Sequence, residues 1–451
     1  MKKKSMKLIS AVLSMILAGS VMAGCAAQNS GSAASSEAPA AESASAADGE
    51  AITITIWDWD TTFTEHMTEY YKEQHPDKNI NFEILSVSTT DFFQKLQGSL
   101  SSGEGVPDIV LCEMGYRGKV FDLGILDDLT QAPYNLDPSE MYDFAIDLGT
   151  AANGELYGIE QQVCPSGLAY RRDLAKEYFG TDDPAELEAM FPDWDSFIAA
   201  GIEVQKKSGG KEYMLPGIIS DAFYILRNQT AAEYITDSTI DITGRYTESL
   251  TTLSKMNDAH IIMPGDSEAT IAEGFANKTF IFYPCTAWVE KWYIEANDPD
   301  GSGNWALMEA PEGGFTFGGT SVCIYKDSKV KEAAWDYVRY TYGDGAGVEE
   351  SYKQYGFMSG FKSLYAEDGL YLTTPSEYDA FFGGQELSKK YKEIMDKGMN
   401  GQVQTTNEAN VLTAIGILGA AYESDPSMTA EDLIARLIQE TQSLCPNVEV
   451  K

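Results

Sequence analysis

The sequence predicts an α/β fold whose first part is a parallel, doubly wound sheet. Three short apolar strands alternate with two amphipathic helices between residues 52 and 112, and strand and helix patterns continue along the rest of the chain. Strand–helix–strand spacing of this kind is typical of parallel sheets covered by helices. The length of 451 residues is enough for about two or three domains.

The first strand, helix and second strand follow from their apolar periodicity. Residues 52–56 alternate isoleucine with threonine, which indicates a half-buried strand. Residues 63–74 carry apolar side chains at helical spacing, and this helix is expected to end before Pro76. Residues 80–87 form the second predicted strand.

The next helix and strand indicate where a ligand would bind. Residues 92–100 are predicted to be helical, and residues 108–112 form a short buried strand that follows Pro107. Ligands of doubly wound sheets bind beyond the carboxyl ends of the strands. Segments 57–60 and 113–117 therefore lie where binding residues are expected.

Three later helices and one more strand are predicted in the same way. Apolar stripes mark helices over residues 194–202 and 332–340, and the second stripe places Trp335 in the core. Thr429 can cap the last helix. The apolar run 280–285 is typical of a buried strand.

The chain is strongly acidic, with 69 Asp and Glu against 32 Lys and Arg and a formal net charge of −37. Such a surface repels nucleic acid and anionic membranes, so neither is an expected partner. Three histidines and six scattered cysteines form no zinc-binding pattern, and we expect no metal site and no cofactor. Buried thiols are predicted at five cysteines in apolar contexts, Cys112, Cys164, Cys285, Cys323 and Cys445.

The amino-terminal segment resembles a lipoprotein signal peptide. Lysines precede the apolar run of residues 8–22, which is short for a transmembrane helix and is followed by small residues. The run ends in Met-Ala-Gly-Cys, which is similar to the lipobox of bacterial lipoproteins. This resemblance implies that residues 1–24 are removed and that Cys25 is diacylated. The alternative is an ordinary secretory signal with a chance cysteine.

Residues 25–50 are predicted to be a flexible tether. They are rich in alanine, serine and glutamate and contain no large apolar side chain. Such a segment buries too little surface to offset the entropy lost on ordering. The folded part should therefore begin near residue 51.

Several motifs follow one another in the order found in a known family. They are WDWD after the first strand, GVPDI at 105–109, LGILDDL at 123–129, GELYGI at 154–159 before LAYRRDL, and GGTS at 318–321 with SKVKEAAW at 328–335. Over residues 51–445 the chain resembles the extracellular solute-binding proteins, the carbohydrate receptors of ABC importers. One departure is Glu160, where the family usually has proline.

This resemblance implies a two-lobed, periplasmic-binding-protein-like α/β fold. Each lobe is built from discontinuous segments, and hinge strands join the lobes beside a cleft. Carried onto this chain, lobe one comprises residues 51–160 and 310–356, and lobe two comprises residues 161–309 and 357–451. The ligand would bind in the cleft.

The WDWD segment is the first candidate for ligand contacts. Trp57 and Trp59 offer aromatic faces for the C–H surface of a sugar, and Asp58 and Asp60 offer carboxylates for its hydroxyl groups. Because side chains alternate along a strand, two of the four are expected to share a face. The alternative is one tryptophan in the core and two acids that solvate a loop.

Two further groups of candidates follow the third strand and the supposed hinge. Glu113 would be a second carboxylate at the cleft rim, with Tyr116 beside it and Arg117 orienting it, or these residues form a surface ion pair. The amides of Gln161 and Gln162 can both donate to and accept from a hydroxyl group, or they lie in an exposed connector.

The remaining candidates come from the second half of the chain. The resemblance implies an aromatic facing the sugar from lobe two at Trp288, whereas Trp292 is more typical of the core. Bare backbone close to the ligand is expected at Phe317, Gly318 and Gly319, unless these residues form a simple turn. Two candidates rest on approximate position alone, Asp221 and Asn407.

The resemblance implies the substrate-binding component of an ABC importer, which captures a mono- or oligosaccharide by cleft closure and delivers it to the permease subunits. It further implies a monomer, without enzyme activity, held by its lipid anchor on the outer face of the bacterial cytoplasmic membrane. One alternative is a sugar-sensing or adhesion lipoprotein of the same fold that does not take part in transport. Another is a glycoside hydrolase, which needs two carboxyl groups at a defined separation.

Overall fold

The computed structural model describes residues 51–230, 233–236, 238–401 and 404–451. The predicted signal peptide and tether, including Cys25, lie outside these ranges. Within them, no helix combines the length and the apolar character needed to cross a bilayer.

The described residues form short strands separated by helices. The strands are β1 (Ile52–Asp58), β2 (Ile80–Ser86), β3 (Ile109–Glu113), β4 (Gly158–Glu160), β5 (Pro165–Arg171), β6 (Thr239–Ile240), β7 (Phe282–Cys285), β8 (Trp305–Met308), β9 (Phe315–Thr316), β10 (Thr320–Ile324) and β11 (Glu449–Val450).

The α-helices are α1 (Thr61–Gln74), α2 (Thr89–Ser102), α3 (Arg117–Phe121), α4 (Asp143–Gly149), α5 (Arg172–Phe179), α6 (Pro184–Met190), α7 (Trp194–Ser208), α8 (Tyr224–Asn228), α9 (Ile242–Asp258), α10 (Glu268–Asn277), α11 (Ala287–Val289), α12 (Lys331–Tyr342), α13 (Gly347–Tyr355), α14 (Leu370–Thr373), α15 (Leu387–Asp396), α16 (Thr406–Ser424) and α17 (Ala430–Leu444). The π-helices are η2 (Ile218–Phe223) and η3 (Glu290–Glu295), and the 3-10 helices are η1 (Pro138–Glu140), η4 (Lys362–Tyr365) and η5 (Glu377–Asp379).

The first sheet has the strand order β2-β1-β3-β10-β4. β1 pairs in parallel with β2 over residues 52–58 and with β3 at Ile56 and Trp57. β10 pairs antiparallel with both β3 and β4. The predicted parallel alternation is therefore confirmed for β1 to β3, whereas β10, from much later in the chain, makes the complete sheet mixed.

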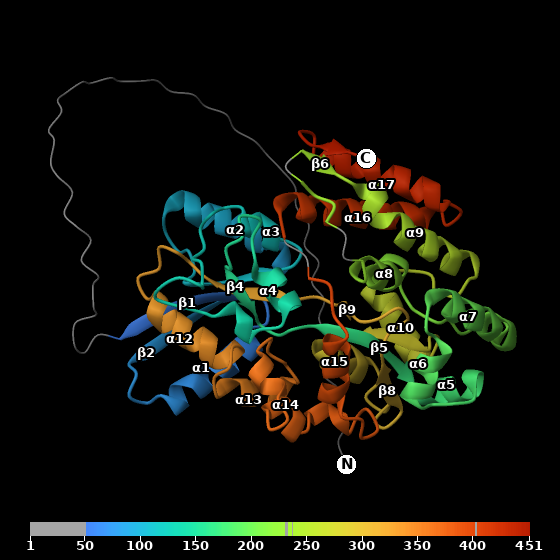
Figure 1. Ribbon diagram of the computed structural model, residues 1–451, viewed down its shortest axis with the longest axis horizontal. Coiled ribbons are helices and arrows are strands. Elements are labelled where there is room, and N and C mark those ends of the chain that lie inside the picture. The colour runs from blue at the N-terminus through green and yellow to red at the C-terminus, as the bar shows by residue number, and fades with distance from the viewer. Residues whose placement is uncertain (1–50, 231–232, 237, 402–403) are drawn as a thin grey trace, which may run out of the picture. The chain divides into compact units, whose positions relative to one another are not determined.

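Helices cover both faces of this first sheet (Figure 1). α1 and α12 contact it from one side, where Phe63 and Tyr71 belong to the main core. α2 and α3 lie on the other side, where Trp57, Phe92 and Tyr116 form a second apolar cluster. The sheet is thus buried on both faces, as expected for a sheet of mainly parallel strands.

The second sheet has the order β7-β5-β8, and β9 also pairs with β5. All three partners run antiparallel to β5, whose seven residues are all buried. Helices α5, α6, α7, α8 and α10 lie around this sheet in Figure 1. α9, α16 and α17 pack against one another, and the short strands β6 and β11 pair in parallel beside them.

Two short connections join the two sheets. Residues 161–164 lead from β4 of the first sheet to β5 of the second, and residues 317–319 lead from β9 back to β10. The connections are hydrogen-bonded to each other, because Gln161 N donates to Thr320 O at 2.8 Å and Phe317 N donates to Cys164 O at 3.2 Å. They therefore form a paired link between the sheets.

Most local predictions are confirmed. α7 and α12 cover the predicted helices, and Trp335 is buried. Thr429 and Asp432 form a reciprocal capping box at the start of α17. Ile202, expected on the apolar stripe of α7, is instead 37% exposed at its edge. The five cysteines of the described residues are buried free thiols.

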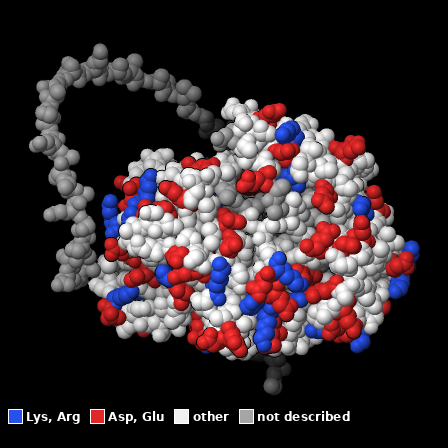
Figure 2. Space-filling model, viewed as in Figure 1, with Lys and Arg blue, Asp and Glu red and all other residues white. Residues whose placement is uncertain are grey.

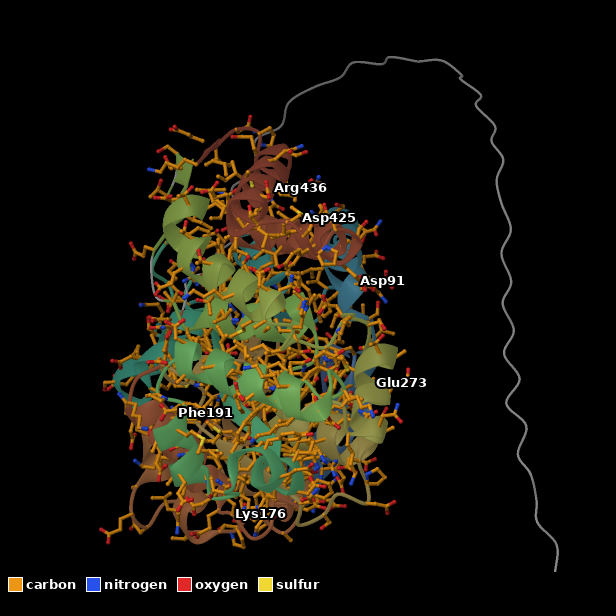
Figure 3. All side chains as sticks on the ribbon, turned by 90° about the vertical axis from the view of Figure 1, so that its right-hand side faces the viewer. Asp91, Lys176, Phe191, Glu273, Asp425 and Arg436 are labelled. Carbon is orange, nitrogen blue, oxygen red and sulfur yellow. The ribbon has the colours of Figure 1, made fainter. Side chains whose placement is uncertain are left out.

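The surface reflects the acidic composition. Figure 2 shows Asp and Glu side chains over much of the visible face, with Lys and Arg interspersed among them. In the view of Figure 3, Asp91 of α2, Glu273 of α10 and Asp425 after α16 are exposed acids from three separate parts of the chain. Much of the negative charge is therefore solvated.

Candidate functional site

A large cavity of about 660 Å³ is lined by residues of both sheets and of their connections. From the first sheet and its helices come Asp58, Trp59, Asp60, Phe63, Thr89, Glu113, Thr320 and Phe357, from the connections Gln161, Gln162, Cys164, Gly318 and Gly319, and from the helices beside the second sheet Glu268, Trp288, Trp292 and Tyr293. We refer to this space as the large cavity.

Asp58 is held in place at the carboxyl end of β1. Its Oδ2 accepts a short hydrogen bond from Thr64 Oγ1, and its Oδ1 accepts one from Asp60 N at 3.0 Å. Burial raises the pKa of Asp58 to about 6, although both hydrogen bonds act in the opposite direction. Near neutral pH the side chain is therefore a carboxylate that is fixed in orientation and largely desolvated.

Glu113 occupies the equivalent end of β3. Gly115 N donates to its Oε2 at 2.8 Å, which turns the carboxylate back over its own loop. Burial raises the pKa of Glu113, and the positive charge of Arg117 partly opposes this effect. Two carboxylates from neighbouring parallel strands thus face one cavity, as the position beyond the strand ends predicts.

In the WDWD segment, the side chains do not alternate between the core and the cavity as they would along a regular strand. Trp57 is buried in the core, edge-to-face with Phe92 at 5.7 Å between ring centroids and with Lys95 Nζ 5.0 Å from its own ring centroid. Its expected position in the cleft is therefore corrected. Asp58, Trp59 and Asp60 all line the large cavity, because β1 ends at Asp58 and the alternation of a strand no longer applies.

Both glutamines predicted at the hinge line the large cavity. They lie on the connection between β4 and β5. Gln162 is 7% exposed, and its Oε1 accepts no hydrogen bond from any described residue. A buried amide oxygen without a partner costs about 1–3 kcal/mol. A ligand that donates a hydrogen bond to this atom would recover that cost.

An aromatic wall stands on the side of the second sheet. Trp288 stacks on Phe317 at 5.4 Å between centroids and donates from Nε1 to Phe317 O at 3.0 Å. Trp292 is 37% exposed, which corrects the expectation that it belongs to the core. The π-helix η3 carries Trp292 and Tyr293, and its wide turn helps bring both side chains to the cavity that Trp288 also lines.

Two glycines allow the backbone to approach this wall. Gly318 has φ +84°, and a Cβ there would lie 3.2 Å from Trp288 Nε1. Gly319 has φ +136°, and a Cβ there would lie 2.9 Å from Glu160 Oε2. Both backbone conformations favour glycine. The GG motif therefore shapes the floor of the large cavity and is more than a simple turn.

Tyr116 and Arg117 do not lie at the cavity rim, and this corrects their expected position. Tyr116 is buried, stacks on Phe92 and donates to Leu111 O at 2.8 Å. Arg117 is fully buried and pairs with Glu160 at 3.0 Å. This ion pair accounts for the acid that stands where the family usually has proline.

Three other candidates also lie away from the large cavity. Asp221 is buried in η2, where Ser220 Oγ donates to its Oδ2 at 3.0 Å. Phe317 is buried between Trp288 and Tyr224, and it supports Trp288 from behind. Asn407 lies in the first turn of α16, partly exposed, and is not among the lining residues.

Sequence reasoning missed several lining residues. Glu268 opens α10 as an exposed acid, and nothing in its local pattern distinguishes it from other helix-start acids. Thr89 and Phe357 likewise carry no local signal. Tyr293 follows Trp288 by five residues, a spacing that an α-helix would place on a different face, and it lines the cavity from the π-helix η3.

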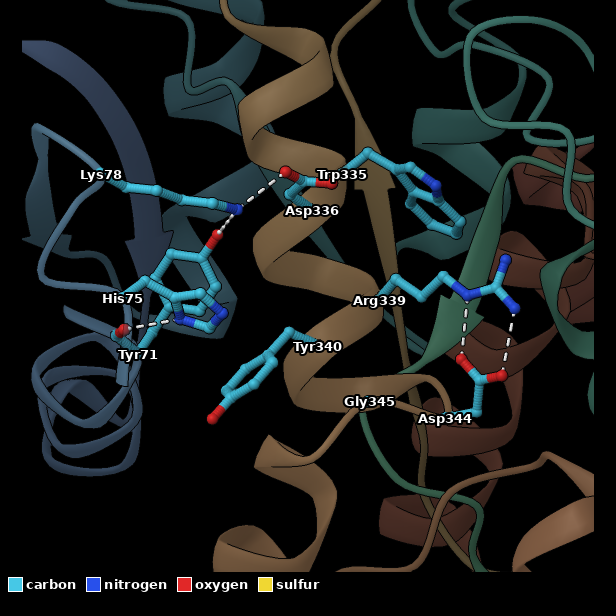
Figure 4. A pocket seen from close by; sticks show the side chains of 9 residues that line it. All are labelled: Tyr71, His75, Lys78, Trp335, Asp336, Arg339, Tyr340, Asp344 and Gly345. Carbon is cyan, nitrogen blue, oxygen red and sulfur yellow. Dashed lines mark hydrogen bonds and ion pairs between the residues drawn. The ribbon is translucent and has the colours of Figure 1, made fainter. Parts of the chain in front are cut away.

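A smaller pocket of about 280 Å³ lies between α1 and α12 (Figure 4). Lys78 Nζ reaches Tyr71 OH at 3.0 Å and Asp336 at 2.9 Å, and Arg339 pairs with Asp344 at 2.8 Å. Its cations are thus already paired within the pocket, and it contains none of the predicted ligand-binding residues. Across the described ranges, no group of three or more His, Cys, Asp and Glu side chains is placed to hold a metal ion.

Three buried carboxyl groups predict that the unliganded protein loses stability as the pH rises from about 5 to about 8. Burial raises the pKa of Asp58 to about 6, of Asp221 to about 7 and of Glu290 to about 8. A carboxyl group with a raised folded pKa stabilises the fold while it is protonated, and this contribution is lost as the pH rises through that pKa. Denaturant unfolding at several pH values measures the effect.

Glu290→Gln tests how much Glu290 contributes to the loss of stability in the upper part of this pH range. Glutamine keeps an acceptor for Tyr391 OH, which donates to Glu290 Oε1 at 2.6 Å. Between about pH 6 and pH 8, the free energy of unfolding should fall by about 2–3 kcal/mol less in this variant than in the parent protein. Glu295→Gln, at an exposed position of the same helix, is the matched control. An unchanged slope in Glu290→Gln would contradict this assignment.

Comparison with known proteins agrees with the geometry. Residues 66–376 match the family of bacterial extracellular solute-binding proteins. The arabinooligosaccharide-binding protein of Bacillus subtilis (strain 168) is 25% identical over 377 residues, which cover 78% of this chain and 80% of that protein.

Solved structures share the two-lobed fold. The galacto-N-biose/lacto-N-biose I-binding protein of an ABC transporter from Bifidobacterium longum has a TM-score of 0.71 at 19% identity, covering 90% of this chain and 100% of that one. The sugar-binding protein MalE from Xanthomonas citri has a TM-score of 0.70 at 16% identity, covering 88% and 98%. The paired strand connections, the cavity between the sheets and the family match agree, and the chain belongs to the bacterial extracellular solute-binding protein family.

Proposed function

We propose that this protein captures a carbohydrate in the large cavity, as the substrate-binding component of an ABC importer. The observation that carries the proposal is the combination of oriented carboxylates, Asp58 and Glu113, with the aromatic wall of Trp288, Trp292 and Tyr293 across one cavity. Carboxylates accept hydrogen bonds from hydroxyl groups, and aromatic faces suit the C–H surface of a sugar ring.

Relatives support the same class of ligand. The curated relative is named for arabinooligosaccharides, and one structural neighbour was solved in complex with lacto-N-biose. The unpartnered Oε1 of Gln162 adds a buried acceptor that a sugar hydroxyl group could satisfy.

Capture would proceed by closure of the two lobes. We propose lobe one at residues 51–160 and 310–356 and lobe two at residues 161–309 and 357–451, with the hinge at the paired connections 161–164 and 317–319. A ligand that touches both lobes favours the closed state by its difference in affinity for the two states. The closed form would then dock on the permease as a monomer.

A thermal-shift screen against neutral mono- and oligosaccharides tests the proposal. A bound saccharide at several hundred times its Kd should stabilise the fold by about 3–4 kcal/mol. The absence of stabilisation across the screen, together with no heat of binding in calorimetry, would refute carbohydrate capture. Chromatography of the bound sugar after long incubation should recover it unchanged, whereas product would indicate the glycoside hydrolase alternative.

We propose that Cys25 carries the lipid that holds the protein on the outer face of the cytoplasmic membrane, with residues 25–50 as its tether. The extracellular family supports an exported location. Cys25→Ser should release the protein from the membrane fraction, because the proposal assigns anchoring to this one acylated residue. Fractionation of cells that express each form measures this, and Cys445→Ser is a control at a buried thiol of the folded part. Retention of Cys25→Ser in the membrane fraction would contradict the lipobox.

A further inference from the structure

The large cavity is lined by acids and by no bases. Among its described lining residues, Asp58, Asp60, Glu113 and Glu268 carry carboxyl groups, and none is Lys, Arg or His. These acids come from both sides, because the first three belong to the first sheet and its loops and Glu268 begins α10. A ligand in the cavity therefore meets negative charge from more than one direction.

Nearby cations are already engaged elsewhere. Arg117 is fully buried and paired with Glu160 at 3.0 Å. Lys291 Nζ donates to Gln354 O at 3.2 Å and lies 4.5 Å from the ring centroid of Tyr355. Neither residue lines the large cavity. The four carboxyl groups thus have no cationic partner inside it.

Resting on the proposed function, we propose that the large cavity selects its saccharide by charge: it accepts saccharides that are neutral or carry an ammonium group, and it excludes those that carry a carboxylate or sulfate. The ligand class follows from what the lining offers, which is mainly hydrogen-bond acceptors. A neutral or ammonium-bearing sugar brings the donors that these acceptors lack, whereas a carboxylate brings acceptors alone.

An independent observation also favours a ligand that donates hydrogen bonds over an anion. Gln162 Oε1 is buried, lines the same cavity and accepts no hydrogen bond from the described residues. Two donors that could have met an anion are already used, since Trp288 Nε1 donates to Phe317 O at 3.0 Å and Gly318 N donates to Tyr224 OH at 2.9 Å. The remaining lining donors are neutral hydroxyl, indole and amide groups, which cannot compensate an additional negative charge.

The electrostatics of the site and of the whole chain act in the same sense. Burial raises the pKa of Asp58 and of Glu113, so their ionised forms already lack full solvation. An anion placed beside them would add repulsion, and a cation would relieve it. The net charge of −37 and the acidic surface in Figure 2 extend this field outside the cavity. One unscreened pair of like charges at about 7 Å is worth about tenfold in affinity at an effective dielectric constant of about 40.

Matched ligands separate charge from shape. The probes are a neutral oligosaccharide that binds in the thermal-shift screen and two derivatives of it, one with its primary hydroxyl groups oxidised to carboxylates and one with them replaced by ammonium groups. Titration calorimetry at pH 7.5 with the mature protein measures the three values of Kd. We expect the carboxylate form to bind at least about tenfold more weakly than the ammonium form, and the difference to shrink at high salt.

Two variants distinguish repulsion from a lost contact. Glu268→Gln and Asp60→Asn preserve the shape of the side chain and remove one negative charge each. Each variant should reduce the ratio of the Kd of the carboxylate form to that of the ammonium form by about threefold or more. Glu273→Gln is the matched control, because Glu273 is exposed on the same helix as Glu268 and does not line the large cavity (Figure 3).

The outcomes are distinct. Equal or tighter binding of the carboxylate form overturns charge selection while leaving carbohydrate capture intact. Charge selection is also overturned if neither variant reduces this ratio of Kd values and salt does not change it, since the weaker binding of the carboxylate form would then come from its shape. If no neutral saccharide binds in the thermal-shift screen or in calorimetry, the proposed function itself fails, and charge selection fails with it.

Discussion

Replacing Arg117 with methionine is expected to lower the free energy of unfolding by about 3–5 kcal/mol. The guanidinium group is fully buried and donates to Cys112 O at 3.2 Å, to Leu148 O at 3.1 Å and to Glu160 Oε2 at 3.0 Å. Methionine fills a similar space but leaves the buried Glu160 carboxylate without a counter-ion, and the neutral hydroxyl group of Ser321, which donates to Glu160 Oε1 at 2.5 Å, does not replace it. Denaturant unfolding at neutral pH measures the loss.

Two companion variants test whether charge is the cause. Lys119→Met, at a partly exposed position of the same helix, should change stability by about 0.5 kcal/mol or less. The double variant Arg117→Met/Glu160→Met should recover much of the loss, because no unpaired charge remains. If the double variant is as unstable as the single one, the loss comes from packing and from the freed carbonyl groups, and the ion-pair explanation is wrong.

The elements that can be predicted from the sequence are those specified by nearby residues. β1, α1 and β2 follow from apolar periodicity, and the capping box of Thr429 and Asp432 marks the start of α17. The position of β10 could not be predicted in this way. Its five residues pair with residues 109–113, about two hundred positions earlier, and a short buried strand has the same pattern whichever way it runs.

The same distinction holds for the site. Asp58, Asp60 and Glu113 were predictable because parallel strands bring their carboxyl ends to one edge, and all three line the large cavity. Arg117 was misplaced because its partner, Glu160, lies 43 residues later in the chain, on strand β4. Local reasoning assigned it to Glu113, its neighbour in sequence, whereas the buried strand β4 supplies the acid.

Two further differences concern Glu268 and Trp292. Glu268 was missed because one acid among 69 carries no signal until the fold brings it to the cavity. The expectation that Trp292 lies in the core did not use its spacing, because residues four apart share one face of an α-helix and Trp288 is expected to face the sugar. Both tryptophans line the large cavity.

Trp335→Ala should mainly lower the stability of the protein, whereas Trp292→Ala should mainly weaken saccharide binding. Trp335 is 7% exposed on α12 and packs edge-to-face on Tyr134 at 5.6 Å between centroids. Truncation of a packed aromatic side chain of this size should cost about 3–5 kcal/mol of stability. The large cavity does not include this residue, so the Kd for the saccharide should stay within about twofold in the molecules that remain folded.

Trp292 should behave in the reverse way, because a large part of its ring faces solvent in the unliganded protein. The residue is 37% exposed, and its ring stacks on that of Tyr355 at 6.3 Å between centroids, at the edge of the large cavity. Its truncation should weaken saccharide binding by about 1–3 kcal/mol, the range for stacking of aromatic side chains on flat ligands. Without ligand, Trp292→Ala should lose much less stability than Trp335→Ala does, because less of the side chain leaves a packed environment.

Calorimetric titration and denaturant unfolding of both variants give two values of Kd and two free energies of unfolding, which test this contrast. If Trp292→Ala unfolds as readily as Trp335→Ala and binds saccharide like the parent protein, the aromatic wall is structural, and the sugar must be held by the opposite side of the cavity.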